Sequence, residues 1–170
     1  LFWGVDAKRV QTFSTQAGEV RRLSFANGSE LFMDSQSKVR SVVKHSLQQV
    51  SLDAGRVWFD TLQSAKTSLA VNAGELRLIS DRASFSVARE GERIDLLVTE
   101  GAVQAWDSRQ RGSERITFAS GSEATLIKAS LVRSVHLSPD ALTRAQAWKT
   151  GHIALDGETV AEAVETFNKH

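Results

Sequence analysis

The sequence has no cysteine, no tyrosine and a single proline, Pro139, among its 170 residues. Without cysteine, the chain can form neither a disulfide nor a metal site with thiolate ligands. Acidic and basic residues almost balance, which gives a net charge of +1, so no overall field attracts the chain to nucleic acid or to an acidic membrane surface. The sequence also lacks a run of 18 apolar residues, the length that predicts a membrane-spanning helix.

The remaining composition is that of an ordinary globular protein, with 41% hydrophobic and 24% charged residues. A chain of this length suits one domain, or one domain and a fragment of a second. It begins with LFWGV rather than with Met. We interpret residues 1–14 as a juxtamembrane stub that remains after a signal peptide or a membrane helix. The alternative is a trimmed terminus without functional meaning.

Between residues 18 and 135, short segments alternate apolar and polar residues, and glycine stands between many of them. This pattern predicts a series of β-strands. VRRLSF and SELFM flank Asn27-Gly28, which predicts a hairpin with a type I′ turn because both central residues of that turn need a positive φ. RASFSVAR and RIDLLV flank a second turn at residues 90–92, and AVQAW leads through a polar loop into RITF.

A weak internal repeat runs through these segments. AGEV begins at Ala17, AGRV at Ala54, AGEL at Ala73 and EGAV at Glu100. The unequal spacing excludes a strict solenoid repeat. Two explanations stay open: the chain stacks strand–turn units with similar corners, or glycine followed by a polar and an aliphatic residue is simply a common way to begin a strand.

The pattern changes near residue 137. Ser138-Pro139-Asp140 predicts the start of a helix, with serine as N-cap and proline at the first helical position, and this helix should extend to about Trp148. After the strand-like segment GHIAL, Thr159 and Glu162 form a capping box that predicts a second helix. Four residues recur at the spacing of one helical face and give this helix an apolar side that needs a partner: Val160, Ala163, Val164 and Phe167.

The usual sequence signatures of catalysis and of metal or nucleotide binding are missing. No histidine has a second histidine or a carboxylate at metal-ligand spacing, and no G-x-S-x-G, G-x-x-x-x-G-K-[ST] or G-x-G-x-x-G motif occurs. The acids Glu90, Glu92 and Asp95 belong to a predicted hairpin tip, where charged side chains are usually solvated. Trp58 and Trp106 lie beside alternating apolar positions, so we expect both in the core. We therefore expect no catalytic residue, no cofactor, no metal and no enzymatic activity.

The order of these elements resembles the periplasmic region of FecR-type regulators, which are transmembrane anti-sigma proteins that work with TonB-dependent outer-membrane receptors. Five blocks over residues 15–170 carry the resemblance: TQAGEVRRLSFANGSELFMDSQSKV, VSLDAGRVWFDT, LAVNAGELRLISDRASFSVAR, LLVTEGAVQAW and AWKTGHIALDGETVAEAVETFNKH. The last block is the most specific, with Ala147, Trp148, Gly151, Asp156 and Asn168 at the family's positions. The chain departs from the family's pattern in having Asn27 for Asp, Arg56 for Glu and His170 for Tyr, and in lacking the Gly-Thr pair that normally precedes Phe85-Ser86-Val87.

The resemblance implies an all-β fold, twisted and solenoid-like or sandwich-like, over residues 15–137. A helical linker would follow at residues 138–150. Residues 151–170 would begin a truncated α/β subdomain, similar to the secretin and TonB short N-terminal domain, with one strand and one helix. Because the rest of that subdomain would be missing, the apolar helix face would pack on the β domain, pack on another copy, or lack its cover.

The resemblance also implies a signal-relay module. In such regulators the signalling domain of a TonB-dependent receptor contacts the periplasmic part. A cytoplasmic part, upstream of Leu1 and reached through a membrane helix, controls an extracytoplasmic-function sigma factor for nutrient or iron-siderophore uptake. The chain would be the periplasmic portion of a bacterial inner-membrane protein without a nucleic-acid partner. We expect five residues to contact the receptor, by strand addition or through a helix face: Trp148, Val160, Ala163, Val164 and Phe167.

Two other functions stay open. A domain that binds glycan or peptidoglycan of the cell envelope would present a stripe of exposed aromatic side chains, whereas the aromatic residues here mostly alternate inward. A β-solenoid hydrolase or lyase would need acidic or basic residues clustered along one face, and the sequence suggests no such cluster.

Overall fold

The computed structural model describes residues 9–25, 28–44, 47–62, 69–80 and 82–147. These residues form strands throughout, followed by one short helix, so the predicted all-β fold is confirmed. The elements are β1 Gln11–Ser14, β2 Arg21–Ser24, β3 Glu30–Met33, β4 Lys38–Lys44, β5 Leu47–Asp60, β6 Leu69–Ala73, β7 Leu76–Ser80, β8 Ala83–Glu90, β9 Arg93–Asp107, β10 Ile116–Ala119, β11 Ser122–Ile127, β12 Ser130–His136 and α1 Pro139–Ala145.

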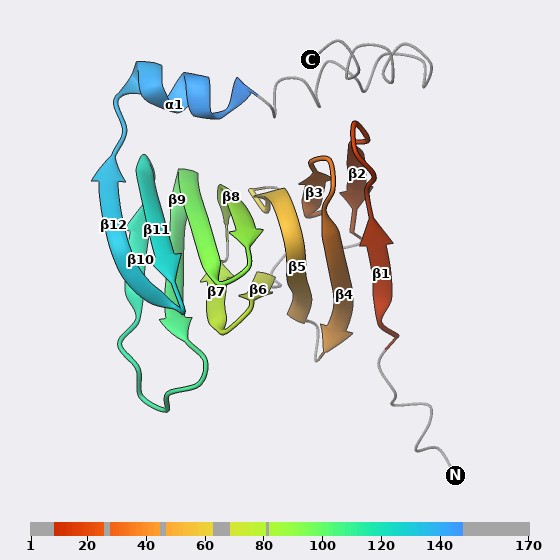
Figure 1. The fold of residues 1–170 in the computed structure, drawn as a ribbon, viewed down its shortest axis with the longest axis horizontal. Coiled ribbons are helices and arrows are strands. Elements are labelled where there is room, and N and C mark those ends of the chain that lie inside the picture. The colour runs from red at the N-terminus through yellow and green to blue at the C-terminus, as the bar shows by residue number, and fades with distance from the viewer. Residues whose placement is uncertain (1–8, 26–27, 45–46, 63–68, 81, 148–170) are drawn as a thin grey trace.

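The strands form two sheets that share the long strands β5 and β9. The first sheet has the order β1-β4-β5-β6-β7-β9-β10, and the second has the order β2-β3-β5-β8-β9-β11-β12. Figure 1 shows the strands as one row, from β1 and β2 at one end to β10, β11 and β12 at the other. Among the described strands, only β5 and β6 pair in parallel. The arrangement is therefore the sandwich-like alternative, with two sheets enclosing one core.

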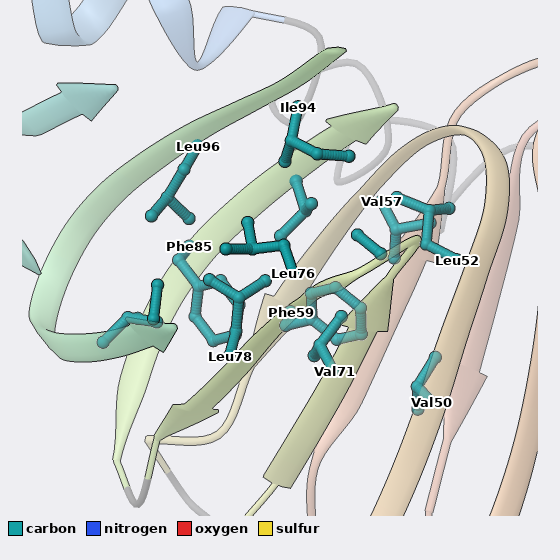
Figure 2. Packing of buried hydrophobic residues seen from close by; sticks show 14 of the residues in the cluster. Val50, Leu52, Val57, Phe59, Val71, Leu76, Leu78, Phe85, Ile94 and Leu96 are labelled. Atoms are coloured by element: carbon teal, nitrogen blue, oxygen red, sulfur yellow. The ribbon is translucent and has the colours of Figure 1, made fainter. Parts of the chain in front are cut away.

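The core fills the space between the sheets. Val50 and Leu52 point into it from the first sheet, and Val57 and Phe59 point into it from the part of β5 that belongs to the second sheet. Phe59 stacks on Phe85 with 5.2 Å between ring centroids (Figure 2). Each side chain of this size contributes about 1.5–3 kcal/mol when it is fully buried. The alternation that predicted strands is thus matched by alternate burial along the first half of β5.

Glycines form the corners at which β5 and β9 cross from one sheet to the other. Gly55 and Gly101 have φ angles of +95° and +76°. A Cβ atom would lie 2.2 Å from Ser37 Oγ at the first corner and 2.3 Å from the Arg82 carbonyl oxygen at the second. Only glycine combines the positive φ with the missing side chain that these close approaches require. Two of the four repeated motifs, AGRV and EGAV, are therefore corners, while Gly18 and Gly74 lie in turns.

The two corners belong to a structural duplication with an offset of 46 residues. Many pairs of residues that lie opposite each other on neighbouring strands recur when both residue numbers are raised by 46. The irregular register beside each corner recurs as well. The pairs Ser14–Lys38, Lys38–Ala54, Val39–Leu52 and Lys44–Leu47 correspond to Asp60–Ser84, Ser84–Glu100, Phe85–Val98 and Glu90–Arg93. The weak sequence repeat is thus the trace of similar strand–turn units, because the spacing from AGRV to EGAV equals this offset.

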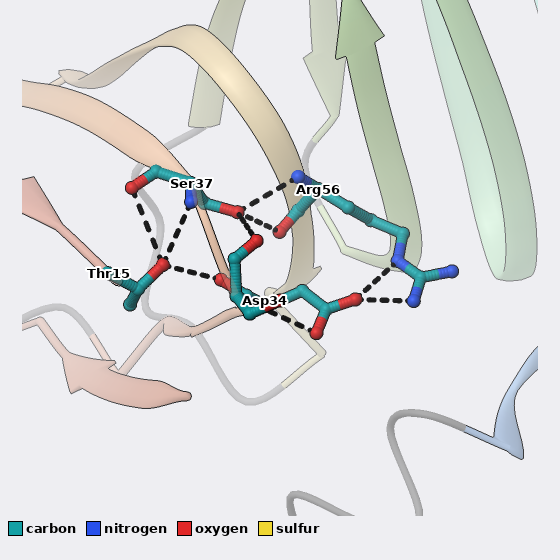
Figure 3. A network of polar contacts seen from close by, with 5 residues as sticks. Thr15, Asp34, Ser37 and Arg56 are labelled. Carbon is teal, nitrogen blue, oxygen red and sulfur yellow. Dashed lines mark hydrogen bonds and ion pairs between the residues drawn. The ribbon is translucent and has the colours of Figure 1, made fainter. Parts of the chain in front are cut away.

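A polar network holds the first corner (Figure 3). Thr15 Oγ1 donates to the carbonyl oxygen of Asp34 at 2.6 Å and accepts from the N–H of Ser37 at 2.9 Å. Ser37 Oγ donates to the Arg56 carbonyl oxygen at 3.1 Å and accepts from the Arg56 N–H at 3.0 Å. The Arg56 guanidinium also pairs with the Asp34 carboxylate. Backbone groups that the sharp bend removes from the strand ladder are thereby satisfied.

The hairpin at Gly28 differs from its prediction. The Phe25 N–H donates to the Ser29 carbonyl oxygen at 2.9 Å, which leaves three residues in the loop rather than two. A three-residue loop with glycine at a positive φ, here +91° at Gly28, is the next most common hairpin connection. The hairpin itself is confirmed, since β2 and β3 pair in antiparallel fashion. The β8–β9 hairpin has the predicted short turn, with Glu90 opposite Arg93.

The helix start is confirmed at α1. Ser138 is the N-cap, its Oγ accepts from the Ala141 N–H at 3.2 Å, and Pro139 opens the helix. The helix ends at Ala145, before the predicted end at about Trp148. The predicted strand and helix within 151–170 lie outside the described residues, and the boundaries at 15–137, 138–150 and 151–170 stay predictions. No helix in the described ranges is long and apolar enough to cross a membrane.

Candidate interaction surfaces

The five residues predicted to contact a receptor, Trp148, Val160, Ala163, Val164 and Phe167, all lie outside the described residues. Within the described ranges, no group of three or more histidine, aspartate or glutamate residues is arranged to hold a metal ion. The candidate surfaces described below therefore come from the strands and loops of the described ranges.

Two acids of the predicted hairpin tip, Asp95 and Glu92, lie beside cations or a hydroxyl. Asp95 accepts from Arg93 at 3.2 Å and from Thr125 Oγ1 at 2.8 Å, while Glu92 lies 3.8 Å from Lys128. Glu90 and Glu92 are exposed. This exposure agrees with the interpretation of a solvated tip.

The outer face of the second sheet carries a row of buried side chains, three of which are apolar. Phe32, Trp58, Ser86 and Leu97 are cross-strand neighbours on β3, β5, β8 and β9. Their exposed fractions are 5%, 0%, 6% and 7%, although none belongs to the core between the sheets. Trp58 is thus buried as predicted, but on the outer face of its sheet. These four side chains are thus buried, although they lie on the face of the sheet that points away from the core.

Trp106 does not lie in the core, which corrects the prediction. It is half-buried on the outer face of the first sheet, opposite Arg77. The guanidinium of Arg115 lies 4.1 Å from the centre of the Trp106 ring, a distance typical of a cation–π contact. The prediction failed because alternation gives the period of a strand and not which of its two faces is inward. The inward neighbour on β9 is Ala105, which is 1% exposed.

Arg109 contacts three segments at one end of the sandwich. Its guanidinium bonds Asp107 Oδ2 at 2.8 Å, Glu75 Oε2 at 2.7 Å and the Lys128 carbonyl oxygen at 3.1 Å. These partners come from the β6–β7 turn, the end of β9 and the β11–β12 turn. The hydrogen bonds from Arg109 hold the pKa of the Asp107 carboxyl below its ordinary value. The charged side chains of Arg109, Asp107 and Glu75 are thus paired with one another.

The edge strand β12 is an open surface. It pairs with β11 alone among the described strands, and almost every residue along it is exposed. Three large hydrophobic side chains lie exposed on it or beside it: Ile127 at 41%, Leu131 at 42% and Val132 at 62%.

A hollow of about 240 Å³ opens next to this edge, between β12 and β10. Its apolar lining includes Leu76, Ala105, Ile116, Leu126 and Leu131. Sequence reasoning missed this site.

A protein-family model described as "FecR protein" matches residues 11–104, which is more than half of the chain. The matched range runs from β1 into the second half of β9 and contains both glycine corners. No curated protein matches the chain.

Two crystal structures of candidate anti-sigma factors from Parabacteroides distasonis are similar to this chain. Their TM-scores are 0.65 and 0.64, with sequence identities of 15% and 16% over 82% and 81% of this chain. The chain covers 64% of the length of each of them. Similarity at this level of identity establishes a shared fold.

Proposed function

Because the chain belongs to the FecR protein family, we propose that it is the periplasmic signal-relay module of a transmembrane anti-sigma factor. It receives a signal from the signalling domain of a TonB-dependent outer-membrane receptor. The whole regulator controls an extracytoplasmic-function sigma factor, and through it the uptake of a nutrient such as an iron-siderophore. The sigma factor binds a cytoplasmic part that is joined to this chain through a membrane helix.

The family match over residues 11–104 carries this proposal. The similarity of the fold to two candidate anti-sigma factors supports it. The exposed strand edges among the described residues also support it. A relay needs such surfaces because its function is contact between proteins and not chemistry.

We assign the receptor contact to Trp148 and to the predicted apolar helix face formed by Val160, Ala163, Val164 and Phe167. An amphipathic helix that docks in a groove anchors itself through residues with this spacing. Aromatic anchors such as Trp148 and Phe167 often dominate the energy of such contacts.

The alternative of an envelope glycan-binding domain receives less support from the aromatic residues. Among the described aromatic side chains, Trp58 is fully buried, and Trp106 is half-buried with Arg115 over its ring. A stripe of open aromatic faces is what a sugar-binding surface would need.

A reporter experiment tests the proposed function. In the bacterium that makes the regulator, the codons for residues 11–146 are removed in frame from the natural gene, and transcription that depends on the sigma factor is measured with and without the receptor's substrate. We expect the response to the substrate to disappear while the regulator remains in the membrane. An unchanged response would contradict a relay role for this domain.

A further inference from the structure

Among the described strands, four lie at sheet edges, and they differ in length. β1, β2 and β10 are each four residues long, whereas β12 has seven residues. Natural proteins protect sheet edges by keeping them short or by placing proline or charges on them. β12 contains no proline and one charged residue, Arg133. Of these four edges, β12 is the one best suited to accept another strand.

The backbone of β12 presents hydrogen-bonding groups outward at known positions. The Leu137 N–H donates to the Gly121 carbonyl oxygen at 2.8 Å. Opposite residues in an antiparallel pair alternate between bonded and non-bonded positions, so Arg133 and Val135 bond to β11. The N–H groups of Ser134 and His136 therefore point away from β11, towards the open side.

The side chains beside this edge offer an apolar contact. Leu131 lies opposite Leu126, whose side chain is 1% exposed in the core, so both face inward. A strand added along β12 would continue the second sheet, and its inward side chains would lie over the hollow of about 240 Å³. The lining of this hollow combines apolar side chains, among them Leu76, Ala105 and Ile116, with the polar side chains of Asp107, Gln110, Ser113 and Glu114. An apolar side chain that packs against the apolar part of this lining would be removed from water, which favours binding.

The charge on β12 distinguishes between partners. Arg133 is exposed, lies opposite Thr125, and makes no ion pair with any residue in the described ranges. It occupies the centre of the strand Ser130–His136. If two copies of β12 paired antiparallel along their full length, the two Arg133 side chains would lie directly opposite each other, which is unfavourable. An acidic residue at that place is favourable.

We propose that β12 is a docking edge for an extended segment of a different protein. This segment has apolar side chains on the face above the hollow and an aspartate or glutamate on the other face, opposite Arg133. The backbone of Ser134 and His136 supplies the hydrogen bonds, the hollow takes the apolar side chains, and Arg133 selects the acid. The inference uses the edge alone and does not depend on the proposed function.

Selection from a phage-displayed library of random peptides, about nine residues long so that they span the edge, tests this inference on the full chain. We expect enriched peptides to alternate apolar residues and to carry a central acid. Ser134→Pro removes the outward N–H without breaking a bond to β11, and it should weaken peptide binding at least about tenfold. Ser134→Ala keeps the N–H and should bind like the parent chain.

Charge reversal provides a second test that leaves the backbone unchanged. Arg133→Glu is an exposed substitution, and selection on this variant should enrich lysine or arginine in place of the central acid. Circular dichroism confirms that each variant is folded. The inference is overturned if no peptide is enriched, or if enriched peptides bind the Ser134→Pro and Arg133→Glu variants as tightly as the parent. It is also overturned if sedimentation reveals a dimer of the parent chain that Ser134→Pro disperses.

Discussion

Thr15 and Thr61 close two corners of the sandwich in the same way. Each threonine Oγ1 accepts a hydrogen bond of 2.9 Å from the backbone N–H of the residue 22 positions later, which is Ser37 for the first and Ala83 for the second. Each threonine N–H donates back to the carbonyl oxygen of that residue, again at 2.9 Å. A short hydroxyl side chain thus replaces the strand ladder where the chain changes sheets.

Replacement of this hydroxyl should destabilise the fold without changing its packing. Thr61 is 1% exposed, and Thr61→Val keeps its shape but leaves the Ala83 N–H buried without a partner. We expect the free energy of unfolding to fall by about 1–3 kcal/mol. Urea denaturation measures the change. Thr61→Ser retains the acceptor and should lose clearly less stability; equal losses for the two variants would argue against the hydrogen bond.

The corner glycines should be more sensitive than other glycines with a positive φ. In Gly101→Ala the new Cβ would lie 2.3 Å from the Arg82 carbonyl oxygen, so the strain of the positive φ and a steric clash add together, at roughly 2–5 kcal/mol in total. Gly112 has a similar φ of +71° but no neighbouring atom within 4 Å, so Gly112→Ala should cost about 1–2 kcal/mol. Thermal unfolding measures the loss of stability in both variants. Equal losses would contradict the assignment of Gly101 to a corner.

The two described tryptophans should respond differently to truncation. Trp58→Ala empties a fully buried site, and we expect a loss of about 3–5 kcal/mol. Trp106 is half-buried, and Trp106→Ala should cost clearly less, including about 0.5–1 kcal/mol from the contact with Arg115. Arg115→Gln in the parent and in the Trp106→Ala background isolates that contact. Denaturant titration that ranks Trp106→Ala as the more harmful change would contradict this placement of the two rings.

The ion pair between Arg40 and Asp53 should make stability depend on pH. The Asp53 carboxylate accepts a hydrogen bond from the Arg40 guanidinium, and this bond lowers the pKa of the Asp53 carboxyl from its ordinary value. Because the folded-state pKa is the lower one, the stabilisation is fully present above the unfolded-state pKa, about 4. It is lost as the pH falls from there through the folded-state pKa.

We expect Asp53→Asn to lose about 0.2–1 kcal/mol at pH 7, because the pair is at the surface. The difference from the parent should vanish at low pH and shrink in 1 M salt, at which the Debye length is about 3 Å. Urea denaturation over a pH series measures both effects. A difference that stayed constant from pH 7 to the acid limit would rule out the ion pair as its cause.

Local sequence signals predicted some parts of this molecule well. The β8–β9 hairpin and the start of α1 follow from a few neighbouring residues, glycine between strands in one case and Ser138-Pro139 in the other. Such turns and caps are decided by local backbone conformation. The inward alternation along β5 likewise follows from the period of a strand.

Other parts depend on tertiary packing that one sequence does not contain. The outward position of Trp106, the duplication offset of 46 residues and the change of sheet at Gly55 are decided by which strands pair. The openness of β12 depends on the absence of a further neighbour among the described strands, which no local pattern reveals. The predicted contact residues from Trp148 to Phe167 lie outside the described ranges and stay predictions.

Calorimetric titration with the signalling domain of the TonB-dependent receptor encoded beside the regulator tests the central claim most directly. Two forms are titrated: this chain, and a longer form that includes whatever follows residue 170 in the natural protein. We predict saturable binding to the longer form at least, weakened about tenfold or more by Phe167→Asp and unchanged by Glu165→Gln off the predicted apolar face. Absence of binding to both forms, with every protein folded by circular dichroism, would contradict the relay account.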